Sequence, residues 1–293
     1  MKRILLLIFM VSLTVSSCQK EDILASESNE VCVTLSANIA SSIAKSINDF
    51  GNGQYINRYT LEIYVLNNGD YTLYGTETKF MSDDTVSLDF SLALMSNQVY
   101  RFITWADYSE DGSDKFYGTQ NSLENITLIG DYDGSDERRD AFYAVLDDYT
   151  LTSESNNISL TLKRPFAQLN VSTYLTGISP SESTPKSLTI SYQDCIPSSF
   201  NTLTGQASDY TSKSFTSTVI DDYVDAETLM HLCTDYIFVS AEQTAELNFS
   251  IQFFSDSEAN NSIITNDKFV NIPIKANYAT NVSGELLSET ILM

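Results

Sequence analysis

The amino-acid sequence predicts an all-β protein built from two antiparallel β-sandwiches. Its 293 residues include 17 Tyr and 15 Phe but one Trp, and this composition favours strands. Many short segments alternate apolar and polar residues between turn signals, while helical periodicity is nearly absent. Such a pattern is typical of sandwiches. The length allows two domains, which we expect near residues 31–163 and 164–293.

The chain begins with an export signal, residues 1–17. Two basic residues precede the apolar run 4–15, which is shorter than the ~20 residues of a membrane-spanning helix. Two serines then lead directly to Cys18, and this order resembles a bacterial lipoprotein signal. The resemblance implies cleavage between Ser17 and Cys18 and acylation of Cys18, so that lipid anchors the chain. The alternative is an ordinary secretory signal with a chance cysteine. Residues 18–30 are polar and are expected to form a tether.

The first predicted strand is Val31–Ile39, where apolar and polar residues alternate strictly. The Asn68-Gly69 pair lies between two β-rich runs and predicts a hairpin. The segment Val99–Ala106 is apolar on both faces, as expected of a central strand, so we interpret Trp105 as a core residue. The other strands expected in the first half are Arg58–Leu66, Tyr71–Tyr74, Thr85–Leu92, Ala141–Leu146 and Ile158–Leu162.

The second half is expected to begin at Lys163–Pro165, and it also consists mainly of alternating runs. The segment Asp225–Leu232 is the best helix candidate in the chain. The strands expected in this half are Phe166–Tyr174, Lys186–Tyr192, Ala245–Phe254, Phe269–Ile274 and Ala279–Leu287.

The strong negative charge excludes several classes of partner. The formal net charge is −23. Nucleic-acid binding requires a basic patch, and adhesion to an anionic membrane surface requires basic clusters. Neither is expected here, whereas a highly charged particle that stays dispersed in water fits the composition.

Catalytic residues are scarce, and we expect no enzyme and no cofactor. His231 is the only histidine, and no nucleophile motif or metal-ligand cluster surrounds it. The acidic residues of segment 107–140 include a partial calcium-loop spacing at Asp131–Gly134, but no carboxylate closes the loop. We interpret these residues as solvated acidic loops and expect no metal site.

Three cysteines remain after Cys18. Cys195 and Cys233 could form a disulfide, because export permits one. The alternative is that Cys32, Cys195 and Cys233 are small, apolar thiols, since their spacing shows no disulfide or metal framework.

Five segments in order resemble the fimbrillin-like surface lipoproteins of Bacteroidota, most closely a group of fimbrial subunits. The segments are Arg58–Tyr64, Trp105–Tyr108, Arg139–Tyr143, Arg164–Asn170 and Asn271–Gly284. The resemblance implies two tandem transthyretin-like Greek-key sandwiches. It also implies a structural or adhesive role at the cell outer membrane, as a fimbrial subunit or as an anchor or tip accessory.

In polymerising members of that family, a trypsin-like protease removes the first strand, and a neighbouring subunit donates a replacement. The resemblance therefore makes other fimbrial subunits the expected partners, through β-strand exchange. Val31–Ile39 would be the strand removed, and Lys45 or Arg58 would be the cleavage position. The tail Leu286–Met293 would be the donor. An anchor would instead keep its first strand and its lipid.

Two further expectations depend on weaker signals. Asp84-Thr85-Val86 resembles a short O-glycosylation motif of the same bacteria, which makes Thr85 a candidate site. The alternative function is that of a glycan-binding surface lipoprotein in a nutrient-uptake system, for which exposed and clustered aromatic rings would be the evidence.

Overall fold

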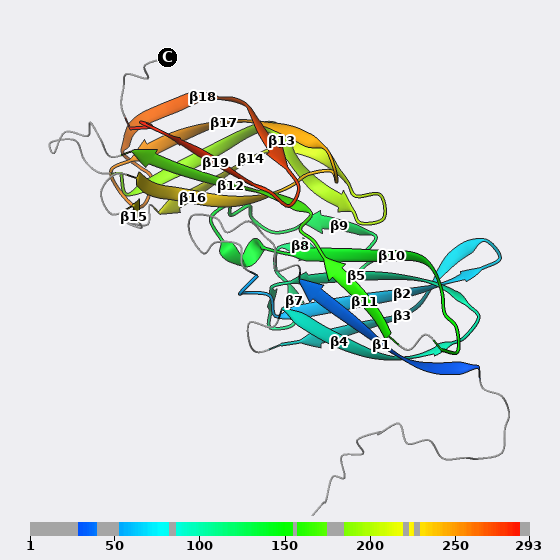
Figure 1. Ribbon diagram of the computed structural model, residues 1–293. Helices are drawn as coiled ribbons and strands as arrows, with labels where there is room; N and C mark the ends of the chain where they lie inside the picture. Colours follow the sequence, from blue (N-terminus) through cyan, green and yellow to red (C-terminus); the bar gives the residue numbers. More distant parts are fainter. Residues whose placement is uncertain are drawn as a thin grey trace, which may run out of the picture.

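A computed structural model describes residues 29–39, 53–81, 86–154, 157–174, 185–218, 223–225 and 229–287. Across these residues the chain forms strands and one short 3₁₀ turn, so the predicted all-β class is confirmed. The strands form two sandwiches that lie end to end (Figure 1). No helix in the described ranges is both long and apolar enough to cross a membrane.

The first sandwich consists of two facing sheets with strand orders β11-β1-β4 and β10-β5-β2-β3. One apolar core lies between them, with Leu35 from one sheet and Leu61 and Phe102 from the other fully buried. Its strands are β1 (Glu30–Ile39), β2 (Arg58–Asn67), β3 (Asp70–Phe80), β4 (Ser87–Met95), β5 (Val99–Asp107), β10 (Phe142–Thr150) and β11 (Asn157–Leu162). The predicted hairpin joins β2 to β3, with Asn68 at φ 52° and Gly69 at φ 97°, the left-handed backbone that a tight hairpin turn requires.

The second sandwich pairs the sheet β15-β16-β12-β19 with the sheet β18-β17-β13-β9-β8, to which β14 is added beside β13. A second apolar core lies between these two sheets. The strands from this half are β12 (Phe166–Tyr174), β13 (Ser187–Asn201), β14 (Gln206–Thr218), β15 (Tyr223–Asp225), β16 (Leu229–Phe238), β17 (Thr244–Phe254), β18 (Ser262–Lys275) and β19 (Ala279–Gly284).

The segment between β5 and β10 connects the two sandwiches. The sequence predicts solvated loops here, but the segment contains a small hairpin, two strands that join the second sandwich and a 3₁₀ turn. These are β6 (Ser109–Glu110), β7 (Ser113–Asp114), β8 (Tyr117–Gly118), β9 (Asn125–Leu128) and η1 (Glu137–Arg139). Because β9 pairs with β13, part of the first half of the chain extends the second sandwich (Figure 1).

A third apolar cluster fills the space between the sandwiches. Trp105 on β5 is fully buried and meets Tyr117 edge to face at 5.4 Å. Phe166 and Phe200 stack on Phe238 at 4.7 and 5.5 Å. The cluster explains why β5 is apolar on both faces: one face joins the core of the first sandwich and the other joins this cluster.

Each sandwich also contains one parallel strand pair, which sequence analysis does not anticipate. In the first, β1 lies between β4, its antiparallel neighbour, and β11, its parallel neighbour. In the second, β12 likewise lies between antiparallel β16 and parallel β19. The parallel pairs therefore join β1 to β11, the first and last strands of the first sandwich, and β12 to β19, the first and last described strands of the second half of the chain.

The expected helix Asp225–Leu232 is wrong. The strand β15 ends at Asp225 and β16 begins at Leu229. The residues Met230 to Phe238 are buried on both faces of the sheet. Such a doubly buried strand has a continuous apolar run, which periodicity alone cannot distinguish from a short buried helix.

Candidate functional site

The strand β1 is built to fill a groove. Its inward side chains are almost completely buried, with exposed fractions of 2% for Val33, 0% for Leu35 and Ala37, and 8% for Ile39. The residues between them lie on the outer face and are at least partly exposed. The strict alternation of apolar and polar residues therefore places the apolar side chains of β1 in the core and the polar ones toward solvent, as predicted.

Both backbone edges of β1 are paired. Leu35 lies opposite Phe90 on antiparallel β4 and opposite Ile158 on parallel β11. On the outer face, Ser36 Oγ donates to Asp89 Oδ1 at 2.6 Å, and Asn38 Nδ2 approaches Ser159 Oγ at 3.3 Å. If β1 left, the sheet would lose its middle strand and expose two unpaired edges and four apolar pockets.

The predicted cleavage position Arg58 is an internal structural residue. It lies in β2 and is 4% exposed. Its guanidinium makes two hydrogen bonds to Asp107, of 2.8 and 2.7 Å, and a third to Asp114 of 2.7 Å. Burial by itself would raise the pKa of Asp114, but hydrogen bonds from Thr119 and from Arg58 outweigh it and hold that pKa below its usual value. A protease cannot reach Arg58 in the folded chain.

Most of the other predicted site residues lie outside the described residues. These are Ser17 and Cys18 of the export signal, Lys45 and the O-glycosylation candidate Thr85. The tail is described only as far as Leu287. Leu286 is 6% exposed and belongs to the second core, and its backbone N–H donates to Thr173 Oγ1 at 3.1 Å.

Cys195 and Cys233 are separate thiols, and no disulfide joins them. Cys195 lies in the β13 bulge, where its Sγ is 3.5 Å from the Asn248 carbonyl oxygen. Cys233 is buried in β16, and burial raises the pKa of its thiol. His231 is 5% exposed in the same strand, with Nε2 3.1 Å from Thr234 Oγ1. The described ranges hold no group of three or more metal-ligating side chains.

Buried ion pairs, which the sequence did not reveal, hold the two sandwiches together. Arg139, the last residue of η1, donates to Asp235 on β16 at 2.6 Å. Arg164, between β11 and β12, makes two hydrogen bonds of 2.6 Å to Asp140. All four residues are at most 4% exposed. Three of them belong to the segments that carry the family resemblance, so these segments coincide with the seam between the sandwiches.

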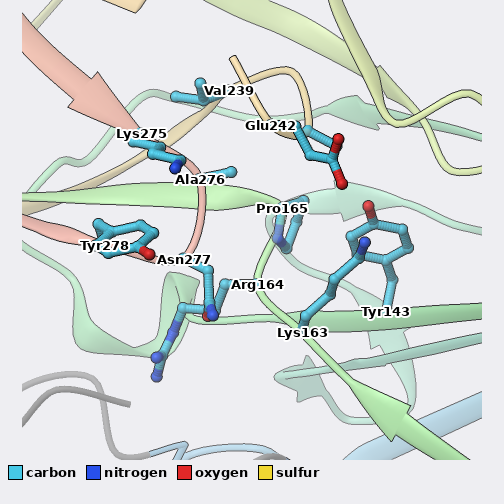
Figure 2. Close-up of a pocket in the computed structure, with 11 residues that line it drawn as sticks. Tyr143, Lys163, Arg164, Pro165, Val239, Glu242, Lys275, Ala276, Asn277 and Tyr278 are labelled. Atoms are coloured by element: carbon cyan, nitrogen blue, oxygen red, sulfur yellow. The ribbon is translucent and has the colours of Figure 1, made fainter. Parts of the chain in front are cut away.

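A cavity of about 200 Å³ opens at this seam. Figure 2 shows Lys163, Tyr143 and Glu242 on one side of it and Lys275 and Tyr278 on the other. Its remaining lining residues are Arg164, Pro165, Val239, Ala241, Ala276 and Asn277. A second cavity, of about 460 Å³, shares Tyr143, Lys163 and Ala241 with it.

Comparison with known proteins finds solved structures of similar fold, among them three fimbrial proteins. The fimbrial anchor protein Mfa2 of Porphyromonas gingivalis is 12% identical, with TM-score 0.44 over 81% of this chain and 83% of that one. A fimbrial assembly protein of Parabacteroides distasonis is 11% identical, with TM-score 0.45 over 87% and 90%. The tip fimbrial protein Mfa3 of P. gingivalis, truncated at its C-terminus, is 10% identical, with TM-score 0.43 over 84% and 90%.

A comparison with curated proteins found no match. A family model does match residues 25–291, nearly the whole chain. The protein therefore belongs to DUF6562, a family of unknown function.

Proposed function

We propose that this protein is a structural, adhesive lipoprotein of a surface fimbria that assembles by exchange of β1. The observation that carries the proposal is the position of β1: among the described residues it is the first strand, and it is also the middle strand of its sheet. One cut after β1 would release it without interrupting any other strand. Lys45 is the basic residue in that stretch, and Arg58 is unavailable because it is buried.

The energetics of β1 favour replacement over simple loss. Burying a Val, Leu or Ile side chain stabilises a fold by roughly 1.5–3 kcal/mol, and β1 buries one of each in addition to Ala37. The open groove would also leave backbone groups of β4 and β11 unpaired. A strand from another subunit would restore both contributions, because its backbone would pair with the edges and its alternate side chains would fill the pockets.

The remaining parts of the proposal concern location and assembly. Cleavage after Ser17 and acylation of Cys18 would tether the mature chain to the outer membrane at the cell surface, with domains at 31–163 and 164–293. Ile291 and Met293 of the tail would supply apolar donor side chains, since Leu286 already belongs to the second core. Fimbrial subunits of the same assembly are the partners, and the role needs neither catalysis nor a cofactor.

A disulfide lock on β1 tests the exchange. Cys32 of β1 lies opposite Ala93 of antiparallel β4, and both are exposed on the outer face. Directly opposed residues of an antiparallel pair have Cα atoms ~4.5–5.5 Å apart, within the ~4.4–6.8 Å span of disulfides. The variant A93C should therefore form a bond to Cys32 that keeps β1 in place.

The assay treats purified protein with a Lys/Arg-specific protease and follows polymers by gel electrophoresis. We expect wild type to polymerise after cleavage at Lys45 and oxidised A93C to stay monomeric until a reductant is added. The matched control C32S/A93C cannot form the disulfide and should polymerise like wild type. Polymerisation of oxidised A93C at the wild-type rate would refute exchange of β1.

Mass spectrometry of the N-terminus of the protein taken from intact cells distinguishes an anchor from a polymerising subunit. An acylated Cys18 indicates an anchor that keeps β1, whereas a new terminus after Lys45 indicates a polymerising stalk or tip subunit. An unmodified, uncleaved Cys18 would contradict the lipoprotein proposal.

A further inference from the structure

We propose that the cavity at the seam binds a sugar that carries one anionic group, a carboxylate or a sulfate ester. The cavity lies where the chain crosses between the sandwiches, away from the strand pairs that β1 makes with β4 and β11. The proposal adds a ligand to the fimbrial role and holds whether or not β1 is exchanged.

Two lysines that line the cavity have no carboxylate partner, although the chain is strongly acidic. In the described part of the chain, all five arginines form ion pairs with carboxylates. Lys186 and Lys213 form no ion pair, and Lys163 and Lys275 form none either, although acidic residues outnumber basic ones by 39 to 16. Instead, their ammonium groups lie over the rings of Tyr143 and Tyr278, at 5.4 and 4.9 Å from the centroids. Two cations without a carboxylate partner therefore line one cavity, and their charge favours an anionic ligand there.

Backbone hydrogen bonds fix both walls of the cavity in the absence of a ligand. Lys163 and Tyr143 exchange two backbone hydrogen bonds, of 2.9 and 3.0 Å. On the opposite wall, Asn277 has φ 63°, and its N–H donates to the Phe166 carbonyl at 2.7 Å. The Tyr278 carbonyl accepts from Gln168 at 3.0 Å. Backbone pairing on both sides holds the main chain of the two walls in place, which reduces the ordering cost of binding.

The other residues that line the cavity favour a sugar as the ligand. Besides the two lysines, the cavity offers the Asn277 amide, the Tyr278 ring and the Glu242 carboxylate (Figure 2). Tyr278 is 58% exposed, and amphipathic rings of this kind contact sugar faces while their hydroxyls stay in water. Glu242 can accept hydrogen bonds from hydroxyls but would repel a second negative charge. This combination suits a ligand with one anionic group and several neutral hydroxyls.

The size of the site limits what it holds. Drug-sized ligands occupy pockets of ~300–1,000 Å³, so the 200 Å³ cavity accommodates about one ring. The larger neighbouring cavity shares Lys163 with it and is lined by Thr161, Thr202 and Thr204, together with the carboxylate of Asp147. A short oligosaccharide could therefore place its anionic ring between the lysines and extend past Lys163.

The test is a calorimetric titration of the whole exported chain with three trisaccharides: trigalacturonate, a sulfated galactan trisaccharide and neutral galactotriose. The variant K163Q/K275Q removes both cations. The matched control K186Q/K213Q removes two other lysines that form no ion pair and lie outside both cavities. Thermal melting checks that both variants fold.

We expect an anionic probe to bind saturably, the neutral probe to bind much less, and the dissociation constant to rise about tenfold in K163Q/K275Q, which corresponds to ~1.4 kcal/mol. Added salt should weaken binding, and K186Q/K213Q should behave like wild type. The probe that binds more tightly identifies the anion. Equal binding of galactotriose, unchanged binding by K163Q/K275Q, or no binding of either anionic probe would overturn the proposal, and none of these results would affect the β1 lock.

Discussion

Replacing Asp235 by Asn should loosen the seam between the sandwiches. Asp235 is fully buried on β16. One carboxylate oxygen accepts from Arg139 Nη1 at 2.6 Å and from the Tyr236 N–H at 2.7 Å. The other accepts from the hydroxyls of Tyr132 and Tyr192 at 2.7 and 2.8 Å. The carboxylate thus ties β13 and β16 of the second sandwich and the connecting segment to one point.

The expected cost follows from what the substitution leaves behind. Asparagine preserves the shape, and its amide can donate to a tyrosine hydroxyl, so most hydrogen bonds survive. The substitution removes the negative charge of Asp235, so Arg139, which is 2% exposed, becomes a buried cation without a carboxylate partner. Breaking a buried pair in this way costs ~3–5 kcal/mol, a large part of the ~5–15 kcal/mol that stabilises a typical protein.

A double-mutant cycle isolates this contribution. Urea denaturation is followed by circular dichroism for the whole chain and by the fluorescence of Trp105, which lies in the cluster between the sandwiches. D235N should lose ~3–5 kcal/mol. The variant R139Q/D235N, which contains no buried charge at this point, should be more stable than the sum of the single losses predicts, by about 2 kcal/mol. A loss below ~1 kcal/mol in D235N, or additive losses in the double variant, would refute the reasoning.

Two further predictions concern the first sandwich. Leu35→Ala in β1 should cost ~2–5 kcal/mol of unfolding free energy, because a fully buried side chain is truncated; Ser91→Ala on the exposed face of β4 is the control, and equal losses in urea denaturation would contradict the burial of β1. Arg101 donates two hydrogen bonds of 2.9 Å to Asp147 and holds the pKa of that carboxyl below its usual 3.8. A depressed pKa adds stability above about pH 4 that is lost as the pH falls through the folded-state value, so Asp147→Asn should lose less stability between pH 5 and pH 2 than wild type, and identical acid profiles would count against this pair.

The local pattern of the sequence was sufficient for most of the strands of the first sandwich. Period-two alternation predicted β1 with its correct buried face, because one face is core and the other is solvent. The Asn68-Gly69 turn was also predictable, since few dipeptides tolerate two left-handed residues in succession. Trp105 was assigned to the core correctly from a strand that is apolar on both faces.

The sequence pattern did not predict secondary structure correctly where burial depends on distant parts of the chain. The β16 run resembles a buried helix because both of its faces are buried: Leu232 and Ile237 lie in the second core, and Tyr236 and Phe238 lie in the cluster between the sandwiches. The Ser/Thr-rich strand β14 gives hardly any apolar signal, since most of its side chains are exposed. Gly134 shows the same dependence: a Cβ at this position would clash with the ring of Phe215, a residue 81 positions away in the sequence.

By itself, the sequence determined the fold class, the face that β1 buries and the order of the segments that resemble fimbrillin-like proteins, because each of these depends on residues that are neighbours in the sequence. Only the tertiary structure decided that Arg58 is an internal ion-pair residue, that Arg139, Asp140, Arg164 and Asp235 hold the seam, and that Lys163 and Lys275 line one cavity. The physical reason is that a charge acquires its role from its desolvation and its partner, and both are set by residues that the sequence places far away.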